Sequence, residues 1–144
     1  MYRVRRAARS DSLGLISVAR DWPTERGSMI VPLDEGGAID IVAEARHLDD
    51  ERYCILVAAG ISDDIVAYAA GLIDSTGQIA SLEELVVAEA HQGRGIGTLL
   101  VRAFERWAGE HACRTVSIAG GPAPGFYAKV GYTRTQAFHF SRRL

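Results

Sequence analysis

Cysteine is scarce in this chain, with only two among 144 residues. Cys54 and Cys113 form neither a Cys-x-x-Cys pair nor a metal-binding pattern, and both sit in apolar surroundings. They are therefore predicted to be small core residues rather than nucleophiles. The four histidines lack a supporting pattern, so no metal site is expected. A chain of this length can bury a proper core without disulfide bonds.

Charge imbalance and long apolar runs are also lacking. The formal net charge is −2, which gives no strong case for nucleic-acid binding. No apolar run is long enough to span a bilayer, and the charged start of the chain is not followed by the apolar region of a signal peptide. We therefore expect a cytoplasmic protein with no membrane or nucleic-acid partner. The length predicts a single domain over residues 1–144.

The first half of the chain predicts a strand, two helices and a meander. A strand at Tyr2–Ala7 precedes a helix that Ser10 or Asp11 caps. An irregular stretch at Trp22–Ala38 and a helix at Ile39–His47 come next. Turn residues then separate three antiparallel strands, which are predicted at Tyr53–Ala59, Ile65–Ile73 and Ile79–Val87.

The second half predicts a helix from Thr98 to about Glu110, with an apolar stripe at helical spacing and polar residues facing outward. The stripe consists of Leu100, Ala103, Phe104 and Trp107, and the outward residues are Arg102, Glu105 and Arg106. The remaining elements are a strand at Thr115–Ala119 parallel to the preceding one, a short helix at Pro122–Val130, and one or two strands within Tyr132–Leu144. This order predicts an α+β fold, a mixed α/β sheet with helices on both faces.

A glycine-rich stretch, Gln92–Gly97, lies between a predicted strand and a predicted helix. The first amides of a helix have no intrahelical partner, and the helix dipole adds partial positive charge there, so a phosphate fits such a site. The stretch lacks the Gly-Lys-Ser/Thr of a P-loop and the third-glycine spacing of a dinucleotide fingerprint. A glycine-rich turn without a ligand is the alternative interpretation.

The stretch instead resembles the pyrophosphate loop of the GNAT superfamily of N-acetyltransferases, Gln/Arg-x-x-Gly-x-Gly, with Gln92, Gly95 and Gly97 in the three motif positions. Leu82–Val87 is similar to the family's fourth strand, and Gly125–Tyr132 is similar to its Phe-Tyr-x-Lys-x-Gly-Phe/Tyr segment. The resemblance implies the acyl-CoA N-acyltransferase fold, a mostly antiparallel sheet with one splayed parallel pair. It also implies transfer of an acetyl group from acetyl-CoA to a primary amine. A non-catalytic acyl-CoA-binding sensor or partner module is the alternative.

The resemblance also implies which residues hold the cosubstrate. Main-chain amides of Leu85 and Val87 would bind the pantetheine arm and the acetyl carbonyl, and the loop amides would bind the pyrophosphate. Arg94 either adds a charge to the pyrophosphate or lies in solvent. The full predicted set is Leu85, Val86, Val87, Gln92, Gly93, Arg94, Gly95, Ile96, Gly97, Thr98 and Phe126.

Tyr127 is the predicted general acid for the departing thiolate, because a phenol of pKa about 10 is protonated at neutral pH. The alternative is a half-buried helix tyrosine whose hydroxyl meets water. Glu83 or Glu84 is the predicted base, since a carboxylate in a mid-sheet strand should have a raised pKa. Strand alternation would put Glu83 on the face of Leu85 and Glu84 on the opposite face, so that only one could reach an acceptor. A purely structural carboxylate is the competing interpretation.

Three expectations concern the surroundings of the site. In relatives, an asparagine after the fifth strand often contacts the pantetheine arm of the cosubstrate. Gly120 stands near that place here, so this contact is either missing or supplied by the main chain. The final strands could pair two chains into a homodimer. Several acids could attract a cationic amine or could form a solvated face; these are Asp34, Glu35, Asp40, Glu44, Asp49, Asp50 and Glu51.

Overall fold

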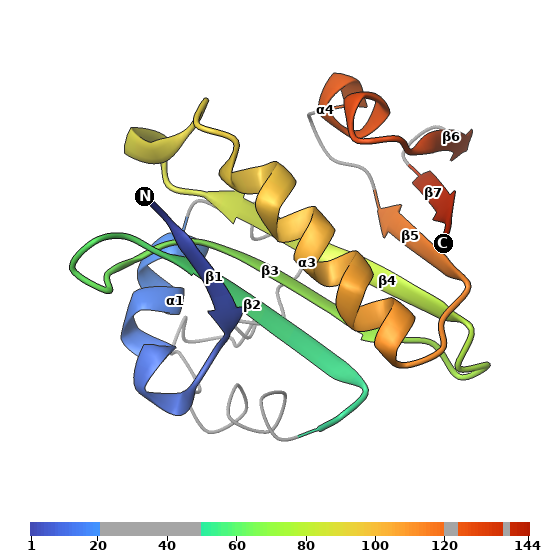
Figure 1. The fold of residues 1–144 in the computed structure, drawn as a ribbon, viewed down its shortest axis with the longest axis horizontal. Coiled ribbons are helices and arrows are strands. Elements are labelled where there is room, and N and C mark those ends of the chain that lie inside the picture. Colours follow the sequence, from blue (N-terminus) through green and yellow to red (C-terminus); the bar gives the residue numbers. More distant parts are fainter. Residues whose placement is uncertain (21–49, 120–123, 137–138) are drawn as a thin grey trace, which may run out of the picture.

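A computed structural model describes residues 1–20, 50–119, 124–136 and 139–144. These residues form one mixed sheet of seven strands in the order β1-β2-β3-β4-β5-β7-β6 (Figure 1). The strands are β1 (Arg3–Arg6), β2 (Tyr53–Ala59), β3 (Ile65–Ile73), β4 (Ile79–Val87), β5 (Thr115–Ala119), β6 (Thr133–Gln136) and β7 (His139–Arg143). The helices are α1 (Ser12–Ala19), α3 (Ile96–Glu110) and α4 (Pro124–Lys129), with short 3-10 turns η1 (Arg9–Asp11) and η3 (Glu89–His91).

The antiparallel meander β2-β3-β4 has the bounds that the sequence predicts. Residues within the two connecting turns, β2 to β3 and β3 to β4, stabilise them. Asp63 takes a left-handed φ of 62° between β2 and β3, and Gly77 takes one of 73° between β3 and β4. In the second turn, Oδ1 of Asp74 accepts hydrogen bonds from the amide and the hydroxyl of Thr76. The prediction of three paired strands is confirmed.

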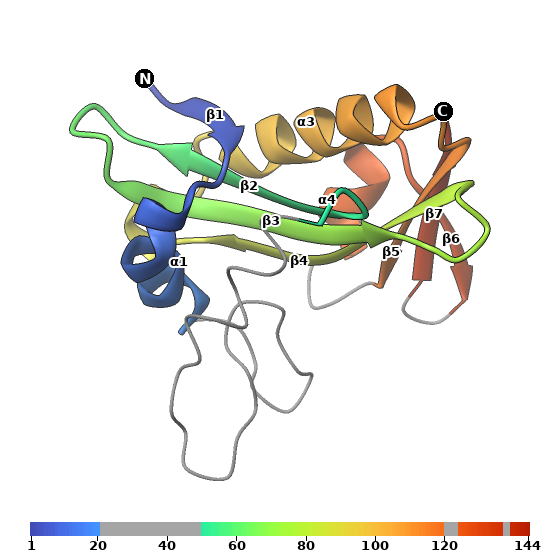
Figure 2. The ribbon, with the colours of Figure 1, turned by 90° about the horizontal axis from the view of Figure 1, so that it is seen from below.

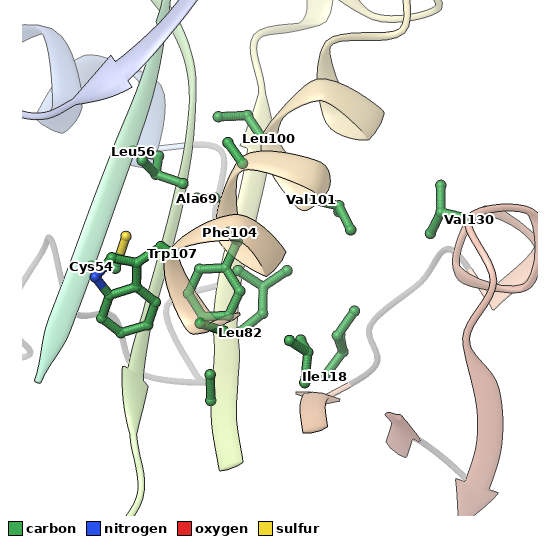
Figure 3. Packing of buried hydrophobic residues seen from close by; sticks show 14 of the residues in the cluster. Cys54, Leu56, Ala69, Leu82, Leu100, Val101, Phe104, Trp107, Ile118 and Val130 are labelled. Carbon is green, nitrogen blue, oxygen red and sulfur yellow. The ribbon is translucent and has the colours of Figure 1, made fainter. Parts of the chain in front are cut away.

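Two helices cover opposite faces of the sheet, α1 on one side and α3 on the other (Figure 2). The apolar stripe of α3 packs on β2, β3 and β4, with Leu100 and Phe104 fully buried (Figure 3). Val101 instead faces Val130 at the end of α4, so α3 also contacts the C-terminal segment (Figure 3). The predicted core role of the stripe is confirmed.

The predicted capping of the first helix is wrong in its details. Asp11 lies at the N-cap position of α1 but makes no side-chain bond to the helix. Its carboxylate accepts hydrogen bonds from the Ala8 amide at 2.8 Å and from the two terminal guanidinium nitrogens of Arg5 at 2.7 and 3.0 Å. These bonds, the Arg5 bond foremost, lower the pKa of Asp11. Asp11 therefore ties β1 to the start of α1.

Strands β4 and β5 are parallel, as predicted, but they pair over a short stretch. The ladder joins Ile79–Leu82 to Thr115–Ile118. Beyond Leu82, β4 continues to Val87 with pairing only to β3 among the described residues. The two strands diverge at this point (Figure 1), so the expected splayed pair is present.

Both cysteines are core residues, as predicted. Cys54 is fully buried in β2, and Cys113 is 5% exposed before β5. Burial raises the pKa of the Cys54 thiol to about 12, which keeps it protonated and unreactive.

Some predictions lie outside the described residues. They are the irregular stretch Trp22–Ala38, the helix Ile39–His47, the acids Asp34, Glu35, Asp40, Glu44 and Asp49, and the Gly120 position. The short helix predicted at Pro122–Val130 is described from Pro124 and ends at Lys129.

Candidate active site

The glycine-rich loop leads directly into α3. Gly93 and Gly95 have left-handed φ values of 76° and 80°, which an L side chain rarely adopts. Gly95 is the N-cap, so α3 begins at Ile96, two residues before the predicted start at Thr98. In the described part of the chain no backbone hydrogen bond is found for the amides of residues 93–98. The loop thus presents six consecutive amides without internal partners, as an anion site requires.

Gly95 offers a direct test of the loop. Alanine at this position would hold a left-handed φ at a cost of roughly 1–2 kcal/mol, or would shift the loop. We expect Gly95→Ala to weaken coenzyme A binding roughly tenfold, which corresponds to about 1.4 kcal/mol. Titration calorimetry measures the Kd for coenzyme A of the variant and of the parent protein. Gly109→Ala is the matched control, because Gly109 lies in the same helix with open space around its Cα and no positive φ. Equal affinities for the two variants would contradict the role of the loop.

Gly97 brings three parts of the predicted site together. A Cβ at Gly97 would lie 3.3 Å from Cζ of Phe126 and 4.0 Å from Cδ2 of Leu85. The helix α4, the end of β4 and the first turn of α3 therefore meet at this point. A side chain at position 97 would have to displace the Phe126 ring by a few tenths of an ångström, so glycine lets this ring lie close to the α3 backbone.

The end of β4 presents main-chain groups toward the open edge. The Ala88 amide bonds to the Val66 carbonyl at 2.9 Å. Antiparallel pairs alternate, so Val86 also bonds to β3, whereas the amides of Leu85 and Val87 point to the edge that β5 leaves open. The Val87 carbonyl accepts a 3.0 Å hydrogen bond from Nε2 of Gln92. Gln92 thus ties the loop to the strand.

A bulge in β4 changes the placement of the two glutamates. The register with β3 shifts between Ala70 and Gly71, which pair with Glu84 and Leu82 and leave Glu83 as the extra residue. Leu82 and Leu85 consequently both face α3, whereas Val86 faces α1. Glu83 and Glu84 then share the α1 face, and the expectation that they lie on opposite faces is wrong.

The two carboxylates differ in their surroundings on this face. Glu84 is 2% exposed, opposite Ala70 of β3. Glu83 is half-buried, and its Oε1 accepts a 2.6 Å hydrogen bond from the Ser81 hydroxyl. One face of β4 thus holds both carboxylates beside the point where the parallel ladder ends.

Tyr127 is held in α4 by a defined helix end. The Tyr132 amide bonds to the Tyr127 carbonyl at 3.0 Å, and the Gly131 amide bonds to the Ala128 carbonyl at 3.2 Å, while Gly131 has a φ of 97°. This is a Schellman motif with glycine at its left-handed position. The Tyr127 ring is 9% exposed and packs against Phe126 and Phe140, each with a centroid distance of 5.3 Å.

Arg94 has a partner that neither sequence interpretation included. One terminal nitrogen of its guanidinium donates to the Tyr2 hydroxyl at 2.9 Å, and that oxygen lies 2.9 Å from Nδ1 of His91. The half-buried ring of His91 also meets the Tyr2 ring edge to face. This cluster connects the residue before β1 to the residue before the loop and to the middle of the loop.

A polar network that the sequence does not predict lies on the other side of α3. Arg102 and Glu105, predicted to face outward, are partly buried and bond to each other, and Glu105 also accepts hydrogen bonds from Tyr132 and Arg142. Arg106 is exposed, as predicted. The short spacing of Arg102 and Glu105 indicated an ion pair, but nothing in it indicated partners 27 and 37 residues away.

The mixed sheet with its splayed parallel pair, together with the glycine-rich loop, is typical of the acyl-CoA N-acyltransferase fold. Comparison with known proteins agrees with this assignment. A family model described as "Acetyltransferase (GNAT) family" matches residues 17–132, and the chain belongs to this family. It is 31% identical over 127 residues to streptothricin acetyltransferase of Streptomyces lavendulae, a match that covers 85% of this chain and 64% of that relative. The chain therefore spans less than two thirds of that relative's length.

Solved structures share the fold at low sequence identity. The PaiA N-acetyltransferase of Thermoplasma acidophilum, in complex with coenzyme A, superimposes with a TM-score of 0.78 at 15% identity, over 100% of this chain and 99% of that one. Glucosamine-6-phosphate N-acetyltransferase of Arabidopsis thaliana gives a TM-score of 0.75 at 15% identity, over 94% of each chain. These likenesses establish the fold.

Two further observations concern membranes and metals. None of the helices that the structure describes combines the length and the apolar character needed to cross a bilayer. Within the same residues, no three His, Cys, Asp or Glu side chains are grouped so that they could hold a metal ion.

Proposed function

We propose that this protein is an acetyl-CoA-dependent N-acetyltransferase that acts on a primary amine of a small molecule or a protein. The observation that supports this most strongly is the meeting of three elements at Gly97. Unpaired amides of the α3 N-terminus, the open edge of β4 and the helix that carries Tyr127 converge there. The chain's membership of the acetyltransferase family supports this proposal.

Each group of residues in the proposed site would have its own role in the reaction. The amides of residues 93–98 hold the pyrophosphate of acetyl-CoA, and the Leu85 and Val87 amides hold the pantetheine arm and polarise the thioester carbonyl. Fixed donors aimed at developing negative charge are usually the largest catalytic contribution. The amine nitrogen attacks the carbonyl carbon, a C–N bond forms and the C–S bond breaks. Tyr127 gives its proton to the departing sulfur, and the amine's proton passes to a carboxylate, directly or through a water.

Glu84 and Glu83 are the proposed acceptors of that proton. The bulge sets both carboxylates on one face of β4, so they can act on the same amine. Two carboxylates near one acceptor also favour a cationic substrate. The relative from Streptomyces lavendulae is named for streptothricin, and a cationic amine of small size is the acceptor class that we propose here.

The proposal is tested by following thiol release from acetyl-CoA in the presence of polyamines, aminoglycosides, streptothricin, amino acids and peptides. We expect turnover with at least one cationic amine. Calorimetry with coenzyme A runs in parallel. Binding of coenzyme A without turnover on any amine would favour the non-catalytic acyl-CoA-binding module, and indifference to coenzyme A would refute both functions.

The cytoplasmic location and a homodimer are further parts of the proposal. β6 is the edge strand of the sheet, so a second chain could pair along it. β6 is, however, only four residues long, with a register shift between Arg134 and Gln136, so it offers a short ladder. Light scattering of the purified protein decides the oligomeric state.

A further inference from the structure

Glu105 is the centre of a polar network between α3 and the C-terminal segment. Its carboxylate accepts hydrogen bonds from the Tyr132 hydroxyl at 2.8 Å and from a terminal guanidinium nitrogen of Arg102 at 2.9 and 3.1 Å. The corresponding nitrogen of Arg142 lies 3.4 Å away. The Glu105 side chain is only 10% exposed, so water screens these bonds little.

The two arginines of the network also bind the end of α4. The Val130 carbonyl accepts a 2.9 Å hydrogen bond from Arg102 and a 3.2 Å hydrogen bond from Arg142. Without the Glu105 carboxylate, two guanidinium groups would share this carbonyl with no anion between them. Glu105 therefore holds both donors in place, and through them it holds the last turn of α4 against α3.

Tyr132 extends the network to the proposed acid. Its amide bonds to the Tyr127 carbonyl at 3.0 Å, and its hydroxyl bonds to Glu105. One residue thus joins the main chain of Tyr127 to the middle of α3. Burial foremost, and then the bond to Glu105, raises the pKa of Tyr132 above its usual value, so its hydroxyl remains a donor across the working pH range.

We propose that Glu105 is a positioning residue for Tyr127. It acts through Tyr132, Arg102 and Arg142, and it sets the position of Tyr127 relative to the cosubstrate bound at the start of α3. The inference rests on the proposed acetyltransferase function. The loop leads directly into the helix that carries the Glu105 carboxylate, so α3 fixes the position of both the proposed cosubstrate site and α4. Phe126 against Gly97 fixes one end of α4, and the Glu105 network fixes the other.

The test compares Glu105→Gln and Tyr132→Phe with Glu110→Gln, a control that makes the same chemical change at an exposed position of the same helix. We expect Glu105→Gln to lower kcat about tenfold and Tyr132→Phe to lower it about threefold. The Kd for coenzyme A should stay within about twofold for both, and Glu110→Gln should match the parent protein. Tyr132→Phe keeps the ring in the core, so it remains informative if Glu105→Gln does not fold.

A second readout reports on Tyr127 without turnover. With 3-fluorotyrosine at position 127, we expect the fluorine resonance to shift in Glu105→Gln and Tyr132→Phe but not in Glu110→Gln. A lower Tm with unchanged kcat and an unchanged resonance would show a purely structural network and overturn the proposal. Equal losses of kcat and coenzyme A affinity would also overturn it. Absence of turnover in the parent protein would defeat the proposed function alone, and the fluorine resonance would then decide the positioning role.

Discussion

Replacement of Tyr127 by phenylalanine is expected to lower kcat by about 10²–10⁴-fold, the range that a general acid typically contributes. Phenylalanine keeps the aromatic ring that packs on Phe126 and Phe140 but removes the proton that the leaving sulfur needs. The loop amides and the β4 edge are untouched, so the Kd for coenzyme A should stay within about twofold. Steady-state thiol release and calorimetry measure the two quantities.

Tyr53→Phe, at the start of β2, provides the control for loss of a tyrosine hydroxyl away from α4. It should leave kcat within about twofold. If Tyr127→Phe kept kcat within threefold of the parent protein, the phenol would be a packing residue, and proton delivery would have to come from water or another side chain.

Gly71→Ala is expected to cause the largest loss of stability among the glycine substitutions. A Cβ at Gly71 would lie 2.6 Å from two ring atoms of Phe104, and it would also collide with the Ser81 carbonyl. Neither group can move freely, because Phe104 is fully buried and Ser81 belongs to the neighbouring strand. Overpacking of a core costs typically 1–3 kcal/mol, and we expect about 3 kcal/mol here because a backbone atom is involved.

Urea unfolding of Gly71→Ala, beside Gly109→Ala, measures this loss. The Gly109 variant should gain roughly 0.5–1 kcal/mol, since alanine is favoured over glycine within a helix and open space surrounds that site. A free energy of unfolding within about 0.5 kcal/mol of the parent for Gly71→Ala would mean that β3 and α3 separate easily at this contact.

The meander and the loop could be predicted from sequence because their signals are local. β2, β3 and β4 are apolar runs bounded by turn residues, and their bounds were correct. The sequence predicts the start of α3 two residues too late, because the glycine-rich pattern runs to Gly97. The backbone enters the helix immediately after the left-handed Gly95, and Gly97 lies in the first turn of the helix, where it allows Phe126 to approach closely.

The bulge and the Glu105 network could not be predicted because their causes are distant in the sequence. A bulge at a residue other than glycine leaves no mark in the alternation of β4, and only the pairing with β3 reveals Glu83 as the extra residue. The helical pattern correctly placed Glu105 away from the sheet. It could not show that Tyr132 and Arg142 would cover that side of α3.

The short parallel ladder has a consequence for how activity is acquired. Among the described residues, the ladder between β4 and β5 has four residue pairs, Ile79–Leu82 with Thr115–Ile118, and it joins the β2-β3-β4 meander to the part of the chain that carries Tyr127. The closure spans a whole helix, so it is a non-local contact of the kind that forms slowly during folding. A chain arrested before this step would have the proposed pyrophosphate loop in place but would lack the proposed acid, Tyr127, beside it. Under the proposed roles, such an intermediate would bind acetyl-CoA and leave its thioester intact.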